Sequence, residues 1–125
     1  MFARAGAAWR WLLFGSEDGW GARLATGRNA IYLLATLAIV AHILDLATGI
    51  NMMLTHGIHL EQNPIARSIM EAAGPLGLAQ VKLGIVSAGV LVFIWNANLG
   101  RARLARNCLV FALGAGMLGA ASNLV

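Results

Sequence analysis

The stretch NAIYLLATLAIVAHILDLATGINMML, residues 29–54, determines the fold class of this chain. Asp45 is its only charged side chain. At about 1.5 Å of rise per residue, a helix of this length crosses the roughly 30 Å hydrocarbon core of a bilayer. Two further apolar stretches follow, at about 75–96 and 104–125. The sequence therefore predicts an all-α integral membrane protein with three transmembrane helices.

The amino-acid composition supports this prediction and excludes several classes of function. The chain of 125 residues is 59% hydrophobic and 11% charged, whereas soluble domains carry roughly 25% charged residues. Its single cysteine, Cys108, excludes an intrachain disulfide and a cysteine-rich metal site. Phosphate-binding glycine loops, nucleotide fingerprints and nucleic-acid motifs are absent from the sequence. We expect no enzymatic activity and no nucleic-acid partner.

The opening segment, residues 1–28, mixes aromatic and basic side chains ahead of the first span. Trp9, Trp11 and Trp20 are interspersed with arginines, a mixture typical of a helix lying in the lipid headgroup region. We expect an amphipathic interfacial segment here and a transmembrane domain over residues 29–125. A disordered basic tail is the alternative for the opening segment.

The distribution of positive charge predicts the orientation in the membrane. The arginines of the opening segment and of the loop between the second and third spans are Arg4, Arg10, Arg23, Arg28, Arg101, Arg103 and Arg106. The loop between the first and second spans holds Arg67 opposed by Glu61 and Glu71. Because positive residues favour the cytoplasmic side, we expect the N-terminus inside and the C-terminus outside a prokaryotic inner membrane. Trp95 then joins the other tryptophans in an inner interfacial belt.

Two charged residues within the spans are predicted to lie at similar depth. Asp45 in the first span and Lys82 in the second would both sit roughly 10 to 14 Å below the outer surface. An ion pair between antiparallel neighbours is the simplest way to bury both charges. Thr48 follows Asp45 on the next turn. A functional ion or proton site built on the same residues is the alternative.

His42 precedes Asp45 by three positions in the first span. This spacing is compatible with a carboxylate that orients a histidine tautomer, or with two metal ligands. His42 is also a possible ligand of a haem or a chlorophyll-type pigment, but the chain offers no second buried histidine for a bis-histidine haem. We therefore expect no metal and no cofactor.

Small residues mark predicted helix-packing positions in the second and third spans. The second span carries Gly84 and Ala88, and the third carries Ala112, Gly116 and Ala120 at intervals of four. Such rows let helix backbones approach closely. The partner helix belongs either to this chain or to another protein.

Asp45 and Thr48 in the first span, Glu61-Gln62-Asn63-Pro64 in the loop and Lys82 in the second span occur in a recognisable order. Over about residues 31–125 the chain resembles the short three-span bacterial and archaeal membrane proteins grouped as domain of unknown function 5658. The resemblance implies that Asp45, Glu61, Asn63 and Lys82 form one polar cluster near the outer membrane face, and it implies no particular activity.

The loop motif also predicts local structure. Asn63 and Pro64 would cap and start a short interfacial helix at about 65–73. Glu61 would then be free to fold back towards Lys82, which would lie between two carboxylates. Such a buried triad is costly compared with apolar packing, so it indicates either specificity of fold or a titrating function.

These observations favour a non-enzymatic accessory or assembly subunit that packs against a larger membrane complex. Its short loops and free helix surface support this hypothesis. The alternative is an ion- or proton-coupled transport element that uses the Asp, Lys and Glu cluster. Because three spans rarely enclose a hydrated path, that alternative requires a homo-oligomer.

Overall fold

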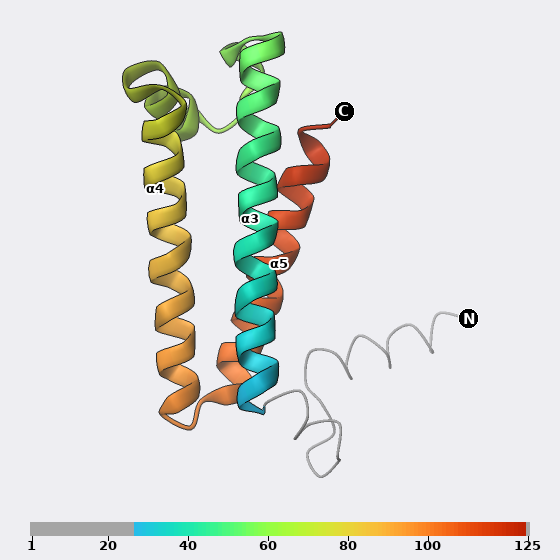
Figure 1. Ribbon diagram of the computed structural model, residues 1–125, viewed down its shortest axis with the longest axis vertical. Helices are drawn as coiled ribbons and strands as arrows, with labels where there is room; N and C mark the ends of the chain where they lie inside the picture. Colours follow the sequence, from blue (N-terminus) through green and yellow to red (C-terminus); the bar gives the residue numbers. More distant parts are fainter. Residues whose placement is uncertain (1–26, 125) are drawn as a thin grey trace, which may run out of the picture.

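A computed structural model describes residues 27–124 of the protein (Figure 1). Its three long helices are α3 (Arg28–His56), α4 (Pro64–Asn98) and α5 (Ala102–Ser122), and the short 3-10 helix η1 (Ile58–Leu60) lies between the first two. All three long helices are apolar and long enough to cross a membrane, so the predicted fold class is confirmed. The predictions for Trp9, Trp11, Trp20 and the interfacial segment concern residues outside the described range.

Helix α4 begins earlier than the predicted second span because it consists of two helical parts. Asn63 caps its N-terminus and Pro64 is its first residue. Gly74 then breaks the helix with φ 66° and ψ −169°, a backbone conformation that glycine adopts without steric cost. Pro75 follows, and its missing N–H is tolerated at the start of a new helical run. Residues 64–73 form the expected short helix, and residues 75–98 form the expected span.

The interface between α3 and α5 is the most extensive in the bundle and depends on small residues. Ala38 and Ala41 of α3 are buried, as are Ala105 and Gly116 of α5. A Cβ added at Gly116 would lie 2.9 Å from the Cβ of Ala41, so glycine is required for this approach. The packing role predicted for Gly116 is confirmed, and Ala112 and Ala120 on the same row are half-buried.

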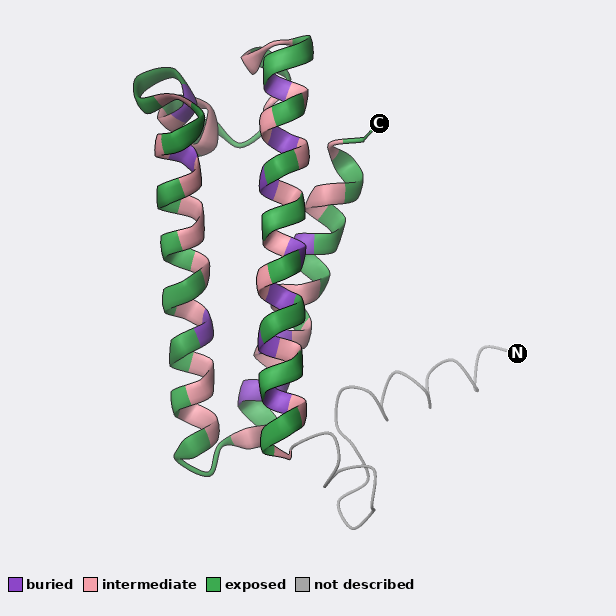
Figure 2. Ribbon diagram, in the orientation of Figure 1, coloured by how far each residue is buried: buried purple, intermediate pink, exposed green. Residues whose placement is uncertain are grey.

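Helix α4 is the least enclosed of the three, and exposed residues run along its length (Figure 2). Its Gly84 and Ala88 are exposed, and a Cβ added at Gly84 would meet no atom within 4 Å. Within residues 27–124 these two residues therefore pack against no helix of this chain, and their packing against another protein stays a prediction. The inward side of α4 carries Leu78, Val86 and Val90 instead, which leaves the small residues on the opposite side.

Two clusters of buried apolar side chains pack the helices together, one towards each end of the bundle. We call the end near residues 57–63 the loop end, and the end where α3 and α5 begin the arginine end. Leu46, Met53, Met70 and Leu78 are buried together towards the loop end. At the arginine end the buried cluster consists of Ile31, Ala35, Val90, Ala105 and Leu109.

Candidate functional site

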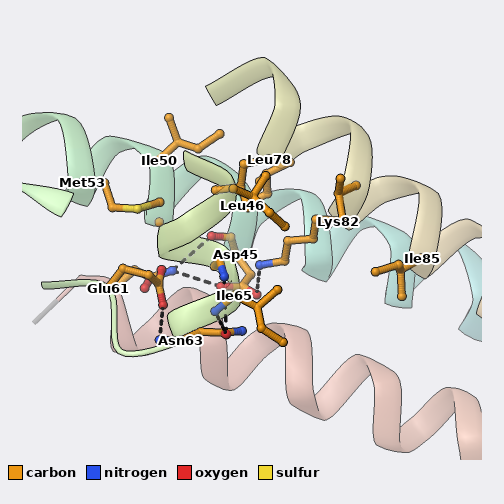
Figure 3. A pocket seen from close by; sticks show the side chains of 15 residues that line it. Asp45, Leu46, Ile50, Met53, Glu61, Asn63, Ile65, Leu78, Lys82 and Ile85 are labelled. Atoms are coloured by element: carbon orange, nitrogen blue, oxygen red, sulfur yellow. Dashed lines mark hydrogen bonds and ion pairs between the residues drawn. The ribbon is translucent and has the colours of Figure 1, made fainter. Parts of the chain in front are cut away.

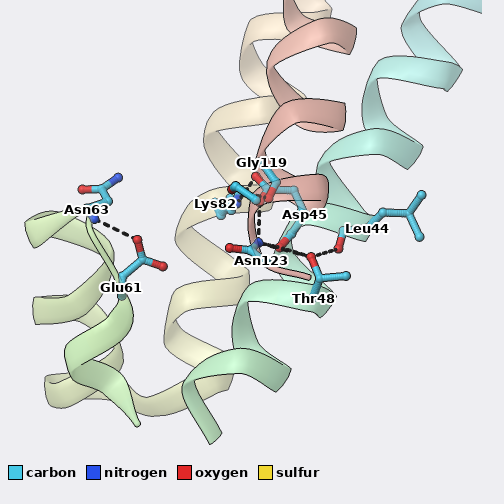
Figure 4. A network of polar contacts seen from close by, with 9 residues as sticks. Leu44, Asp45, Thr48, Glu61, Asn63, Lys82, Gly119 and Asn123 are labelled. Carbon is cyan, nitrogen blue, oxygen red and sulfur yellow. Dashed lines mark hydrogen bonds and ion pairs between the residues drawn. The ribbon is translucent and has the colours of Figure 1, made fainter. Parts of the chain in front are cut away.

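Asp45 of α3 and Lys82 of α4 form an ion pair within the bundle (Figure 4). Lys82 Nζ lies 2.6 Å from Asp45 Oδ2. The side chains of Lys82 and Asp45 are 30% and 15% exposed, so the carboxylate is the more enclosed of the two groups. The pair is the one that the depths of these residues predict, and it joins two neighbouring antiparallel helices.

Asn123, which follows α5, completes the environment of this carboxylate. Its Nδ2 group donates to Asp45 Oδ1 at 3.0 Å, to the Asp45 carbonyl oxygen at 3.1 Å and to Thr48 Oγ1 at 3.2 Å. Each carboxylate oxygen of Asp45 therefore has a donor from a different segment of the chain. Asn123 is not among the site residues predicted from the sequence, although it follows Gly116 by seven residues on the packing row of α5, where a polar side chain is unusual.

Gly119 makes room for the carboxylate between α3 and α5. A Cβ added there would lie 2.5 to 2.6 Å from the carboxylate atoms of Asp45. Real Cβ atoms do not approach other atoms this closely, so a side chain at this position would displace Asp45. The charged group thus occupies a space that a glycine keeps open.

Thr48 supports the same network from the turn that follows Asp45. Its hydroxyl donates to the carbonyl oxygens of Leu44 at 2.8 Å and Asp45 at 3.1 Å, and its oxygen accepts from Asn123. The spacing of Asp45 and Thr48 in the sequence therefore places both acceptors within reach of one amide group.

The Glu61-Gln62-Asn63-Pro64 motif closes the loop onto the start of α4. Asn63 Oδ1 accepts from the main-chain N–H of Ile65 at 3.0 Å and of Ala66 at 3.4 Å. This confirms the predicted cap, and Pro64 starts the helix as expected. Arg67 then donates to the carbonyl oxygens of His59 and Glu61, which anchors the loop to the first turn of the helix.

Glu61 does not form the expected triad with Lys82. Its Oε1 accepts the main-chain N–H of Asn63 at 2.8 Å, and within residues 27–124 the ion pair of Lys82 is with Asp45 alone. The physical reason is local, because Glu61 reaches the main-chain N–H group two residues ahead. Instead of two carboxylates around one lysine, the structure has the ion pair of Asp45 and Lys82 and a separate hydrogen bond from the Asn63 N–H to Glu61.

A cavity of about 190 Å³ nevertheless brings these polar groups to one space between α3 and α4 (Figure 3). Its polar lining residues are Asp45, Glu61, Asn63, Lys82 and Asn123. Its remaining walls are mostly apolar, with Leu46, Ile50 and Met53 from α3 and Leu78 and Ile85 from α4 among them. The space is large enough for several waters or a small ligand.

Comparison with known proteins identifies the family of the chain. A family model described as a domain of unknown function (DUF5658) matches residues 28–125. The chain belongs to the DUF5658 family. No curated protein and no solved structure matches it. The polar network of Asp45, Thr48, Lys82 and Asn123 lies within the matched region of this DUF5658 protein.

His42 is separate from the hydrogen bonds of this DUF5658 site. Asp45 directs its carboxylate to Lys82 and Asn123 rather than to the imidazole. His42 Nδ1 is buried without a hydrogen-bond partner among the described residues. Within residues 27–124 no group of three or more His, Cys, Asp or Glu side chains is arranged to hold a metal ion. The expectation of no cofactor stays a prediction, with a haem or pigment at His42 as its alternative.

Proposed function

We propose that this DUF5658 protein is a non-enzymatic accessory or assembly subunit of a larger membrane complex, and that its partner contacts the outward side of α4. The observation that supports this role is a row of small and unsatisfied polar side chains on that side. We call this row of Gln80, Gly84, Ser87 and Ala88 the outward row.

The outward row combines two features that a lipid-facing helix surface does not need. Its members follow one another at helical spacing, and all of them are exposed. Within residues 27–124, the Gln80 amide and the Ser87 hydroxyl make no hydrogen bond. The other serine and threonine hydroxyls in that range each donate to a carbonyl oxygen of their own helix, namely those of Thr36, Thr48, Thr55, Ser68 and Ser122.

A second transmembrane helix would satisfy both features of the outward row. Ser87 lies about 18 Å along the helix from Pro75 at 1.5 Å per residue, near the middle of the span. Polar groups at that depth gain free energy from hydrogen bonds to a neighbouring helix, and small residues let its backbone approach. The open space around Gly84 leaves room for such an approach.

The ion pair of Asp45 and Lys82 is compatible with the same proposal. Asp45 already has donors from Lys82 and Asn123 within the chain, so the pair requires no external ligand for its neutralisation. We propose that this pair specifies how the helices of the bundle assemble. The charged residues then hold the bundle in the shape that presents α4 to its partner.

The test is co-purification from the native membrane in mild detergent, with identification of bound proteins by mass spectrometry. The wild-type protein should retain a membrane complex in constant stoichiometry. Gly84→Leu should lose that complex, because the leucine fills the space for the partner helix. Gly114→Leu is the matched control, since Gly114 is exposed on α5 and a Cβ there also meets no atom within 4 Å. Equal retention by both variants would reject the proposal.

The cavity beside the ion pair favours a second candidate, an ion- or proton-coupled transport element. Lys82 is 30% exposed and lines that cavity together with Glu61. This candidate requires a homo-oligomer to enclose a path through the bilayer. It predicts proton or cation flux in vesicles reconstituted with the purified protein, and loss of the flux in the double variant Asp45→Asn, Lys82→Met. Flux that survives in the double variant would exclude the pair as the coupling site.

A further inference from the structure

A second cavity of about 190 Å³ lies at the arginine end of the bundle. It forms where α3 begins, α4 ends and α5 begins, at the lower end of the bundle in Figure 1. Its polar lining side chains are those of Arg28, Tyr32 and Asn98, and its apolar walls include Ile31 and Ile94. This cavity is separate from the one beside Asp45, because the two share no lining residue.

The polar groups of this cavity have no partner within the described residues 27–124. The Arg28 guanidinium, the Tyr32 hydroxyl and the Asn98 amide make no hydrogen bond or ion pair in that range. These three groups together offer several N–H and O–H donors, and arginine supplies them in a planar fork that matches the oxygens of a phosphate group. The cavity is therefore equipped to receive an anion.

Among the described residues, the charge around the cavity has one sign. The described arginines at this end are Arg28, Arg101, Arg103 and Arg106, whereas the described carboxylates, Asp45, Glu61 and Glu71, all lie in the half of the bundle nearer the loop end. In addition, α3 and α5 both begin here without a side-chain cap. The N–H groups of these two first turns add partial positive charge.

The position of the cavity along the helices indicates which anion reaches it. It lies at the ends of transmembrane helices, where a bilayer has its headgroups. Trp95, 67% exposed near the end of α4, is a residue type enriched at that level. The apolar side chains of Ile31 and Ile94 form walls next to the polar groups. The cavity therefore offers polar donors for the phosphate group of a phospholipid and an apolar surface for its acyl chains.

We infer that the cavity lined by Arg28, Tyr32 and Asn98 binds the phosphate group of an anionic phospholipid. Arg28 supplies the charge, and Tyr32 and Asn98 donate further hydrogen bonds to the phosphate oxygens. Arg101, exposed at the same end, raises the local concentration of anionic lipid, as basic groups near a membrane surface do. Lipid binding here is independent of the proposed partner of α4, because the outward row contributes no residue to this cavity.

The test is native mass spectrometry of the purified full-length protein in mild detergent with added lipid. Phosphatidylglycerol and phosphatidylcholine with the same acyl chains are titrated in parallel. We expect one phosphatidylglycerol to stay bound at lipid concentrations that give no phosphatidylcholine adduct. Arg28→Gln should weaken this binding about tenfold, as the loss of a charge-assisted hydrogen bond of about 1.4 kcal/mol predicts. Tyr32→Phe should weaken it by a smaller factor.

Arg101→Gln is the matched control, because it removes the same charge at the same end and Arg101 is not among the residues that line the cavity. It should weaken phosphatidylglycerol binding much less than Arg28→Gln does. Equal losses of phosphatidylglycerol affinity in the two variants would show that any positive charge at this end attracts the lipid. That result would overturn the proposed binding site. Equal binding of the two lipids would also overturn it. Displacement of the lipid by millimolar inorganic phosphate would assign the cavity to a soluble anion and overturn the lipid assignment.

Discussion

The side-chain amide of Asn123 lies 3.0 Å from Asp45 Oδ1, although the two residues are 78 positions apart in the chain. The same amide also reaches the main-chain oxygen of Asp45. The residue that follows α5 is thereby attached to a half-buried carboxylate in α3. Because Lys82 holds the other carboxylate oxygen, Asp45 is the one residue bonded to both other parts of the bundle within this network.

Asn123→Ala should destabilise the bundle by about 1–3 kcal/mol, since it leaves an oxygen of an enclosed carboxylate without a donor. The measurement is unfolding by sodium dodecyl sulfate in mixed micelles, followed by circular dichroism. Ser122→Ala is the control, because the Ser122 hydroxyl bonds only to the carbonyl oxygen of Gly119 in its own helix. Equal stability of the two variants would contradict a role for Asn123 in holding α5 to α3.

Removing one charge of the Asp45 and Lys82 pair should cost more than removing both. Asp45→Asn or Lys82→Met alone strands a charge in the bundle and should destabilise it by about 3–5 kcal/mol. The double variant should recover most of that loss, because it leaves no unpaired charge. The same unfolding assay measures all three variants. Glu71→Gln, which removes an exposed carboxylate, should change stability little. Additive losses in the double variant would disprove the pairing.

Gly116→Ala should force α3 and α5 apart. The added methyl group would lie 3.0 Å from the main-chain nitrogen of His42 as well as close to Ala41, and such overpacking costs about 1–3 kcal/mol. Gly114→Ala should instead leave stability unchanged or raise it by up to about 1 kcal/mol, because its position is open and alanine favours the helix. A neutral Gly116→Ala variant would show that the two helices do not approach this closely.

Asn63→Ala should loosen the start of α4. The loss of its accepting oxygen leaves two main-chain N–H groups unpaired, for a cost of about 0.5–2 kcal/mol. Asn63→Asp keeps an acceptor at the same place and should retain most of the stability. Hydrogen exchange of the Ile65 and Ala66 amides is the direct measurement. Faster exchange in the alanine variant alone is expected, whereas equal exchange in both variants would rule out the cap.

The distribution of arginines predicts that the loop end faces outwards. Two variants test this in a Cys108→Ala background: Gln62→Cys at the loop end and Leu99→Cys at the arginine end, both at exposed positions. A membrane-impermeant maleimide added to intact cells should label the first and spare the second. Labelling of the second alone would reverse the orientation.

The three spans can be predicted from sequence because hydropathy and length determine them almost alone. The break in α4 is also predictable, since Pro75 cannot continue a hydrogen-bonded helix. The ion pair follows from the depths of Asp45 and Lys82, a one-dimensional argument that needs no knowledge of how the helices rotate. Each of these features depends on residues close together in the sequence or on distance along a helix axis.

Features that depend on helix rotation cannot be predicted in the same way. Gly84 and Ala88 have the spacing of a packing row, but spacing alone does not tell which neighbour the row faces. The role of Asn123 depends on the register of α5 against α3, which the sequence does not state. Glu61 contacts the main-chain N–H of Asn63 rather than Lys82, and that competing donor becomes evident only when the loop is built.

The two side chains that bond to the Asp45 carboxylate are synthesised after Asp45 itself. Lys82 follows Asp45 by 37 positions and Asn123 follows it by 78. At about 5–20 residues per second, the ribosome adds Lys82 about 2–7 s and Asn123 about 4–16 s after Asp45. During that interval α3 carries an unpaired carboxylate, which water or the insertion machinery must accommodate. Because a charged group inside lipid is costly, we expect release of this helix into lipid to be disfavoured until Lys82 and Asn123 have been made.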